Sequence, residues 1–326
     1  MMNPVDILAH NYADIMRGQV EPFLASIRQE GFFEARYGLR IHYEMLLHPQ
    51  AQAAFVISHG FTESAEKFRE MAYRCYAQGY SVFAIDHRGH GQSNRHVQAE
   101  HLTHVNDFSD YVDDFERFVD QIVVPNCAGK PKYLFGHSMG GAIAALTLIR
   151  RPGCFDCAIL NAPMIQAKTG GVPLRIAQVV TRMMCALGMS KMLMPGFAKR
   201  FAPDEKFETS CSACRERFDY YLAKRVATPH LRNTSPTVGW VMNAMQVPDV
   251  LLDPQNARAI TCPVLLLQAE SDDSVENFAE DRFAAMLPEG RLVRIAGSKH
   301  EIFMSADDVL DVYYRTLFDF LKEDRP

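Results

Sequence analysis

The stretch "LFGHSMGGAIAALTLI", residues 134–149, decides the fold of this chain. A short apolar run ends at a serine with glycines two residues before and after it, and an apolar helical pattern follows at once. Glycine inside a helix or strand costs conformational entropy on folding, so the presence of these two glycines calls for an explanation. Glycines at these positions let a serine occupy a strained turn between a strand and a helix, with its hydroxyl above the sheet edge. The pattern from Gly136 to Gly140 therefore predicts that Ser138 is a nucleophile.

Short apolar segments alternate with longer helical patterns along most of the chain. The predicted strands lie in "AAFVISHG", "YSVFAIDHRG", "KYLFGHS", "CAILNAP", "CPVLLLQAE" and "RLVRIAG". Helical patterns occur at residues 64–78, 107–123, 139–150 and 276–286. This alternation predicts an α/β protein with a mostly parallel sheet and helices on both faces. We expect an antiparallel hairpin before it, in "FFEARYGLRIHYEMLLHP".

The alternation of predicted strands and helices stops after Asn161 and starts again at Cys262. Between these points only helical patterns occur, punctuated by Pro and Gly, and no buried-strand run is present. The simplest explanation is a helical cap inserted between two neighbouring strands. We therefore divide the chain into an N-terminal helical arm (1–30), a catalytic core (31–162 and 256–326) and a helical cap or lid (163–255).

Composition and charge exclude several classes of protein. Of 326 residues, 48% are hydrophobic and 22% are charged, as in ordinary soluble domains, and a net charge of −5 argues against nucleic-acid binding. The N-terminal residues lack the apolar run of a secretory signal, and no run reaches the length of a membrane span. We expect a cytoplasmic protein whose eight cysteines are reduced. The two C-x-x-C pairs lack a zinc-ribbon context, so we expect neither a metal nor an organic cofactor.

A serine nucleophile needs a base and an acid that orients the base, and in this type of turn they follow in the order serine, acid, histidine. Two histidines follow Ser138. His230 lies in the insertion, whereas His300 follows the last predicted strand and is the expected base. The acid is expected in "ESDDSV", after the strand "VLLLQAE". We choose Asp272, which lies in the turn before the next helix, and Asp273 remains the alternative.

The reaction also needs donors for a developing oxyanion. One amide should come from Met139, directly after the nucleophile, and the other from Phe61 in the loop after the first buried strand. Gly60 lets that loop approach closely. We expect His59 to fix the loop through hydrogen bonds and His137 to point away from the hydroxyl into the packing.

Several motifs taken together resemble a known family. They are "SHGFTESAEKF", "IDHRGHGQS", "GHSMGG", "NAPM", "QAESDDSVEN" and "GSKHEIF". From Gly31 onward the chain resembles the serine-hydrolase branch of the α/β-hydrolase family, and within it the bacterial lysophospholipases and monoacylglycerol lipases. This resemblance implies an α/β-hydrolase fold and hydrolysis of the carboxylic ester of a single-chain lipid through an acyl-enzyme. The "DHRGHG" turn is expected to be a structural loop that borders the site.

Other functions are compatible with the same residues. Within the fold, the triad also serves small-ester hydrolases, carbon–carbon-bond hydrolases and acyltransferases. Epoxide and haloalkane hydrolysis are disfavoured, because those reactions would require Asp in place of Ser138. A lipid-binding or lipid-sensing module without catalysis is the alternative from another class, and a fluorophosphonate probe that failed to label Ser138 would support it.

The insertion differs from the rest of the chain in charge. Residues 164–200 contain six Lys and Arg, no Asp or Glu, and six of the sixteen methionines. The whole cap has a net charge of +5 and the remainder −10. Apolar residues from Ile176 to Leu187 follow helical spacing. Either the cap covers the site with its apolar face while its cations are solvated, or it contacts an anionic membrane surface peripherally, at the inner membrane.

Overall fold

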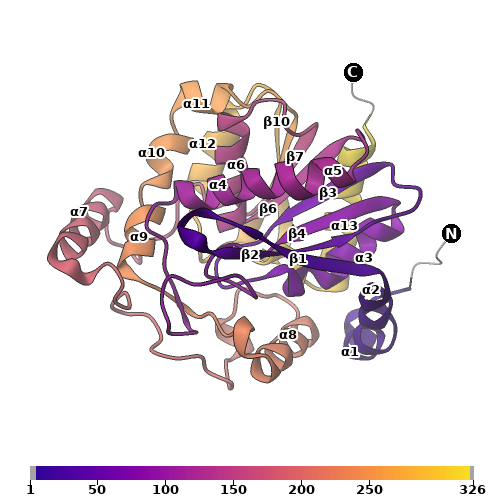
Figure 1. Ribbon diagram of the computed structural model, residues 1–326, viewed down its shortest axis with the longest axis horizontal. Helices are drawn as coiled ribbons and strands as arrows, with labels where there is room; N and C mark the ends of the chain where they lie inside the picture. Colours follow the sequence, from indigo (N-terminus) through magenta and orange to yellow (C-terminus); the bar gives the residue numbers. More distant parts are fainter. Residues whose placement is uncertain (1–4, 324–326) are drawn as a thin grey trace.

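The computed structural model describes residues 5–323, and its centre is an eight-stranded sheet (Figure 1). The strand order is β1-β2-β4-β3-β6-β7-β9-β10. The β1–β2 and β2–β4 pairs are antiparallel and the other five pairs are parallel. The strands are β1 (Arg28–Glu34), β2 (Arg40–Leu46), β3 (Ala53–Ser58), β4 (Tyr80–Ile85), β6 (Lys132–His137), β7 (Cys157–Asn161), β9 (Val264–Ser271) and β10 (Gly290–Lys299).

Helices cover both faces of this sheet, as the sequence predicts (Figure 1). Successive residues of a strand point to opposite faces, and in β3 the side chains of Ala54 and Val56 belong to one hydrophobic core while Phe55 and Ile57 belong to the other. The first core includes side chains of α4 (Ser109–Phe118), α6 (Met139–Arg150) and α12 (Asn277–Met286), and the second includes those of α3 (Arg69–Ala77) and α13 (Asp307–Lys322).

The N-terminal segment packs on the second core. It is helical from Ala9 to Ile27, and Tyr12, Met16, Val20 and Leu24 are buried at every fourth position. Residues 1–4 lie outside the described part of the chain. The segment comprises a turn (Ala9–Asn11), α1 (Tyr12–Ile15), a π-helical turn (Met16–Val20) and α2 (Glu21–Ile27).

The expected hairpin is present as β1 and β2. The strands are joined through the turn Arg36–Gly38, in which Tyr37 has φ 68° and Gly38 has φ 67°. Strand β1 starts at Arg28. Residues 28–30, which were predicted as part of the N-terminal helical arm, therefore belong to the sheet.

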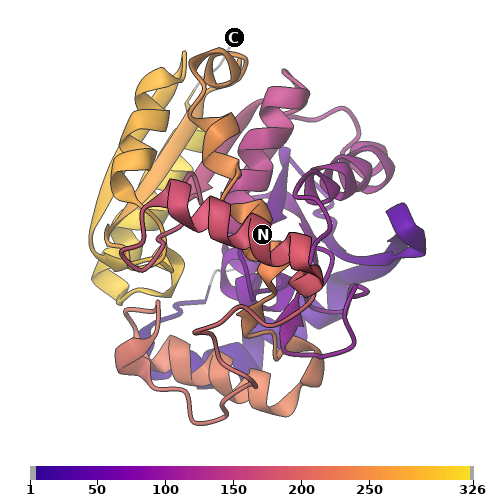
Figure 2. The same ribbon diagram turned by 90° about the vertical axis from the view of Figure 1, so that its left-hand side faces the viewer.

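The stretch between β7 and β9 is mainly helical. Its one strand, β8 (Ser235–Pro236), pairs with β5 (Leu102–Thr103) and is too short to produce a recognisable apolar run. Figure 2 shows α7 in front of the sheet, on the side opposite the N-terminal helices of Figure 1. The helices are α7 (Leu174–Met184), continued by Cys185–Met189, then α8 (Arg215–Ala227), α9 (Val238–Ala244), α10 (Val247–Leu251) and α11 (Pro254–Arg258), with short turns at Phe207–Thr209 and Pro229–Leu231.

The helical patterns in the sequence correspond to observed helices. Residues 64–78 contain the turn Ala65–Phe68 and α3, residues 107–123 contain α4 and the turn Val119–Val123, and the other two patterns are α6 and α12. The helix α13 was not among the predicted ones. The remaining elements are α5 (Val124–Asn126) and the turn Ile302–Met304.

Candidate active site

Ser138 lies in the sharp turn between β6 and α6. Its backbone has φ 52° and ψ −119°, a conformation that costs energy for a residue with a side chain. The flanking glycines make the turn possible. A Cβ at Gly136 would lie 2.7 Å from the carbonyl oxygen of Gly140, and a Cβ at Gly140 would lie 2.1 Å from that of Ser58. The strain holds the hydroxyl at the start of the helix, as the sequence pattern indicates.

Three side chains form a continuous line of hydrogen bonds at one edge of the sheet. Oγ of Ser138 lies 2.8 Å from Nε2 of His300, and Nδ1 of His300 lies 2.7 Å from Oδ2 of Asp272. Asp272 directly follows β9 and His300 directly follows β10, so two parallel strands bring the acid and the base to the same edge. This arrangement can transfer the serine proton to the imidazole while the carboxylate orients the ring.

Of the two candidate acids, the structure brings Asp272 to His300. The other oxygen of Asp272, Oδ1, accepts hydrogen bonds from the backbone amides of Ser274 and Val275, at 2.8 and 2.9 Å. The side chain of Asp273 is exposed and accepts a hydrogen bond from the Ser274 hydroxyl at 3.0 Å. The turn amides therefore hold the first carboxylate in place and leave the second at the surface.

Burial and hydrogen bonding determine the charges of this pair. Burial alone would raise the pKa of Asp272, but the hydrogen bond with His300 and those from the turn amides bring it below its usual value. Burial alone would lower the pKa of His300, but Asp272 raises it overall. The ion pair thus favours the imidazolium, the form that the base takes after it accepts a proton.

The backbone amides of Phe61 and Met139 border the serine. Met139 is the first residue of α6, so its amide lies at the positive end of the helix. Gly60 brings the other loop close, since a Cβ there would lie 3.1 Å from Cβ of Ser138. Within residues 5–323 neither amide donates to another protein group. Such unpaired donors beside a nucleophile can stabilise an oxyanion.

Neighbouring histidines have structural partners. Nδ1 of His59 lies 2.7 Å from the carbonyl oxygen of the next residue, and its Nε2 accepts the amide proton of His87 at 2.9 Å. Nδ1 of His137 lies 2.9 Å from the side-chain amide of Asn161. Burial lowers the pKa of His59, and it lowers that of His137 to about 4. His230 is exposed in a turn of the insertion. None of the three hydrogen-bonds to the serine hydroxyl.

The "DHRGHG" turn is held by buried polar groups. Asp86 accepts hydrogen bonds from the amides of Ala65 and Gln92, at 2.8 and 3.0 Å. Arg88 donates two to Asp114, at 2.6 and 2.7 Å, and neither side chain is exposed to solvent. The side chains of Asp86 and Arg88 thus form hydrogen bonds that hold the loop in the fold. This agrees with the structural role expected from the sequence.

A helix of the insertion covers the site. Trp240 of α9 packs against Phe61 with a distance of 4.1 Å between the ring centroids, and its indole NH donates to the hydroxyl of Tyr111 at 3.2 Å. Ser138 is only 9% exposed. The reacting group therefore lies beneath the insertion, in surroundings that exclude most solvent.

Three charged side chains near the site were missed in the sequence. Nζ of Lys67 lies 3.0 Å from a carboxylate oxygen of Glu63 and also contacts the carboxylate of Glu301. The four-residue spacing of the first two could have indicated an ion pair. Nothing in the sequence indicates that the pair is buried or that it reaches the residue after His300.

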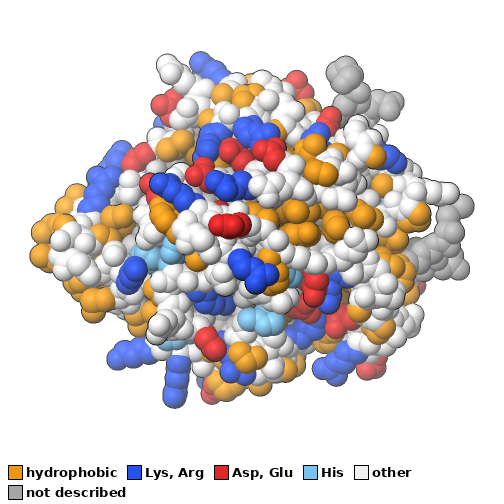
Figure 3. Space-filling view, viewed as in Figure 1, with side chains coloured by type: hydrophobic (Ala, Val, Ile, Leu, Met, Phe, Trp, Pro, Cys, Tyr) orange, Lys and Arg blue, Asp and Glu red, His pale blue; other side chains and the backbone are white. Residues whose placement is uncertain are grey.

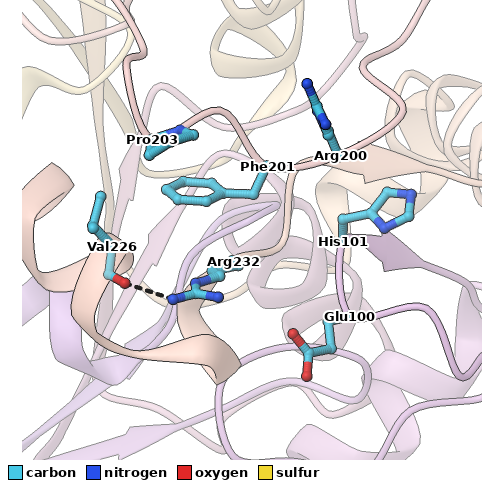
Figure 4. Close-up of a pocket in the computed structure, with 7 residues that line it drawn as sticks. All are labelled: Glu100, His101, Arg200, Phe201, Pro203, Val226 and Arg232. Atoms are coloured by element: carbon cyan, nitrogen blue, oxygen red, sulfur yellow. Dashed lines mark hydrogen bonds between the residues drawn. The ribbon is translucent and has the colours of Figure 1, made fainter.

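A cavity of about 370 Å³ opens between the insertion and the segment before β5. Figure 4 shows Arg232 beside Phe201, with Glu100 opposite, and Arg200 points away from Arg232. Arg232 donates a hydrogen bond to the backbone oxygen of Val226 at 2.6 Å. Charges of both signs line the cavity, and none of the five residues expected to act in catalysis is among them. It is therefore distinct from the hydrogen-bonded site.

Within residues 5–323, one group of three side chains could approach a metal ion together: Glu30, His42 and Glu44. Both oxygens of Glu44 contact Arg69, and Nδ1 of His42 lies 2.9 Å from Asp86. Glu44 and His42 therefore already have partners inside the fold.

Comparison with known proteins gives the family. The family model described as serine aminopeptidase, S33, matches residues 49–307. The chain belongs to this family. This chain is also similar to curated lipases: lysophospholipase L2 of Escherichia coli K12 is 33% identical to it over 285 residues, which are 81% of this chain and 79% of that protein. Monoacylglycerol lipase of Mycolicibacterium smegmatis is 27% identical over 292 residues, covering 88% of this chain and 95% of that protein.

The solved structures show a similar fold. A soluble variant of monoglyceride lipase from Saccharomyces cerevisiae, in complex with a substrate analogue, has a TM-score of 0.71 and 18% identity, covering 91% of this chain and 95% of that one. The S33 member described here thus has an α/β-hydrolase fold and is a hydrolase. Within residues 5–323, no helix combines the length and apolar character needed to span a membrane.

Proposed function

We propose that the protein is a serine hydrolase that cleaves the carboxylic ester of a lysophospholipid or a monoacylglycerol. The main support is the hydrogen-bonded line from Ser138 through His300 to Asp272, which provides a nucleophile, a base and an orienting acid. The names of the two relatives, lysophospholipase L2 and monoacylglycerol lipase, suggest the substrate. Both kinds of lipid contain one acyl chain joined by an ester to a glycerol unit.

In the proposed mechanism, Oγ of Ser138 attacks the ester carbonyl while Nε2 of His300 accepts the hydroxyl proton. The amides of Phe61 and Met139 donate hydrogen bonds to the resulting oxyanion. As the carbon–oxygen bond of the ester breaks, His300 returns the proton to the leaving alcohol and an acyl-serine remains. Water then attacks the acyl-serine with the same base, which releases the fatty acid and restores the serine.

The test compares fatty-acid release from lysophosphatidylcholine and from a monoacylglycerol of the same chain length, with Ser138→Ala as the control. We expect this substitution to lower kcat by at least about 10⁴-fold, because the nucleophile is lost. A fluorophosphonate probe should label the wild type and not the variant. Preserved activity in the variant would overturn the assignment. Labelling without release from either lipid would instead indicate a small ester or another scissile bond.

The insertion also presents an apolar surface next to cations. Half of the large exposed hydrophobic side chains of residues 5–323 lie between residues 172 and 197. In Figure 3 this surface is the orange area at the left, where α7 lies, with Lys and Arg at its borders. Its residues, called here the α7 surface, are Val172, Ile176, Val179, Val180, Met183, Leu187, Met192 and Phe197.

We infer that residues 163–255 act as a lid and that the α7 surface contacts an anionic membrane. The contact would bury apolar area while Lys191, Lys199 and Arg200, which are exposed and form no ion pair within residues 5–323, attract the lipid headgroups. Each cation near such a surface contributes about 1 kcal/mol. Reversing all three to Glu should therefore weaken binding to phosphatidylglycerol-containing vesicles by at least about 100-fold.

A matched control reverses Arg282, Arg315 and Lys322, which are also exposed and lie on α12 and α13. It changes the net charge by the same amount and should retain more of the binding. Equal loss in both triple variants would show that the attraction depends on net charge alone and would refute the α7 surface as the contact. Unchanged binding in the first variant would refute the membrane contact itself.

A further inference from the structure

The cluster of Glu63, Lys67 and Glu301 connects the two loops beside the serine. Lys67 lies in the helical turn Ala65–Phe68, and its ammonium contacts one carboxylate from each loop. The exposed fractions of the three side chains are 4%, 7% and 17%. Two rings, of Tyr221 and Phe303, flank the ammonium at 5.0 and 5.9 Å. A buried bridge of this kind is strongly sensitive to loss of one partner, unlike an ion pair at the surface.

Glu63 fixes the loop that contains Phe61. Its Oε2 accepts a hydrogen bond from the backbone amide of Gly60 at 2.7 Å. Its Oε1 lies 3.6 Å from Nε2 of His137, the residue before Ser138. Burial alone would raise the pKa of Glu63, but Lys67 and the neighbouring histidines lower it to about 2. The group is therefore an anion, and its position determines where the Phe61 amide lies.

Glu301 fixes the loop that contains the base. It directly follows His300, and its backbone amide donates to the carbonyl oxygen of Cys211 at 3.1 Å. The ammonium of Lys67 holds its side chain toward Glu63. Without the ammonium, two carboxylates would face each other in a partly buried space and repel. Lys67 is therefore the cation that links the carboxylates of the two loops.

We propose that Lys67 is a positioning residue for hydrolysis, which holds the oxyanion loop and the His300 loop at the separation that the tetrahedral intermediate requires. This inference rests on the proposed function, because it assumes that Ser138 attacks and that the Phe61 amide stabilises the oxyanion. A displacement of about 1 Å in such a site can cost about 100-fold in rate. The effect should appear in kcat, since the charged contacts of Lys67 are with Glu63 and Glu301 and not with the serine.

The experiment compares Lys67→Met, Lys67→Arg and Lys224→Met, with activity normalised to the folded fraction well below each melting temperature. Lys224 is the matched control: it also bridges two carboxylates, those of Glu21 and Glu66, and it is 18% exposed. We expect Lys67→Met to lower kcat by about 10- to 100-fold with KM changed less than threefold. The arginine variant keeps the charge and should recover kcat to within about fivefold of wild type. Lys224→Met should lower the melting temperature only.

If Lys67→Met does not fold, Glu301→Ala cuts the bridge at the histidine loop and leaves the Glu63 pair in place, and the same fall in kcat is expected. A bridge that only stabilises the fold would lower the melting temperature of Lys67→Met and leave kcat unchanged, and this outcome overturns the inference. Failure of the proposed function has a different signature, because Ser138→Ala would then retain turnover. If Ser138→Ala is inactive and Lys67→Met is fully active, the positioning role of Lys67 is rejected and the proposed function stands.

Discussion

Glu280, on the inner face of α12, should make the protein less stable as the pH rises. Its side chain is fully buried, and within residues 5–323 neither carboxylate oxygen has a partner at hydrogen-bonding distance. Burial raises its pKa to about 9. The Gln268 side chain acts in the opposite direction, and the negative charges of Asp272 and Asp281 act in the same direction as burial. The folded protein therefore keeps this carboxyl protonated at neutral pH.

The magnitude follows from the difference between the folded and unfolded chains. In the unfolded chain the group loses its proton near its ordinary value of 4.5. Between pH 4.5 and pH 9 only the unfolded state releases the proton, so the free energy of unfolding falls by about 1.4 kcal/mol per pH unit. At pH 7 the loss is about 3 kcal/mol, and below pH 4.5 it vanishes because both states are protonated.

Glu280→Gln removes this ionisation with little change of shape. We expect it to stabilise the protein by about 3 kcal/mol at pH 7, or roughly 4 °C in Tm for a chain of this length, and by less than about 1 kcal/mol at pH 5. Urea unfolding of the wild type and the variant should be measured from pH 5 to pH 8.5. Glu289→Gln, at an exposed position after the same helix, is the control and should show no such trend.

A stability difference between wild type and Glu280→Gln that stayed constant with pH would refute the reasoning. So would a destabilised variant at pH 8, because a charged Glu280 would then have a partner that the structure does not show. The comparison isolates one group, since every other titrating residue is common to both proteins.

Other expectations concern the site. Asp272→Asn should lower kcat by about 10⁴-fold through the wrong imidazole tautomer, whereas Asp273→Asn should stay within about twofold, and equal losses in both would contradict the assignment. Glu301→Gln removes a negative charge that raises the pKa of His300, so the acid limb of kcat/KM should move to lower pH; an unmoved limb would contradict this. Gly140→Ala should prevent formation of the serine turn, because its Cβ would lie 2.1 Å from a backbone oxygen, and an active, normally folded variant would disprove that geometry.

The sequence predicts the parallel core well because buried strands are continuous apolar runs and the nucleophile turn has a strict glycine pattern. The observed α6, Met139–Arg150, has the bounds that were expected. The helix α13 was missed, although its apolar positions follow a helical period. This helix lies after the motif that contains His300, and it contains none of the motifs from which the site was predicted.

The site was predicted less completely, for two physical reasons. Asp272 and Asp273 are adjacent and chemically identical, so only the turn amides decide which one faces the base. The contact between Lys67 and Glu301 joins residues 234 positions apart. A single sequence gives the charges of both residues but not their contact.

The attachments of the insertion limit how it can move. The guanidinium of Arg217 in α8 is fully buried and pairs with Glu70 and Asp307, at 3.1 and 2.9 Å. Freeing it would cost on the order of 3–5 kcal/mol. The α7 end is held by weaker polar contacts, in which Gln178 donates to the backbone oxygen of Met245 at 2.7 Å. If the insertion is a lid, as proposed above, we expect its two ends to differ in mobility: displacing α7 should cost less free energy than displacing α8, because only α8 is anchored by a buried ion pair.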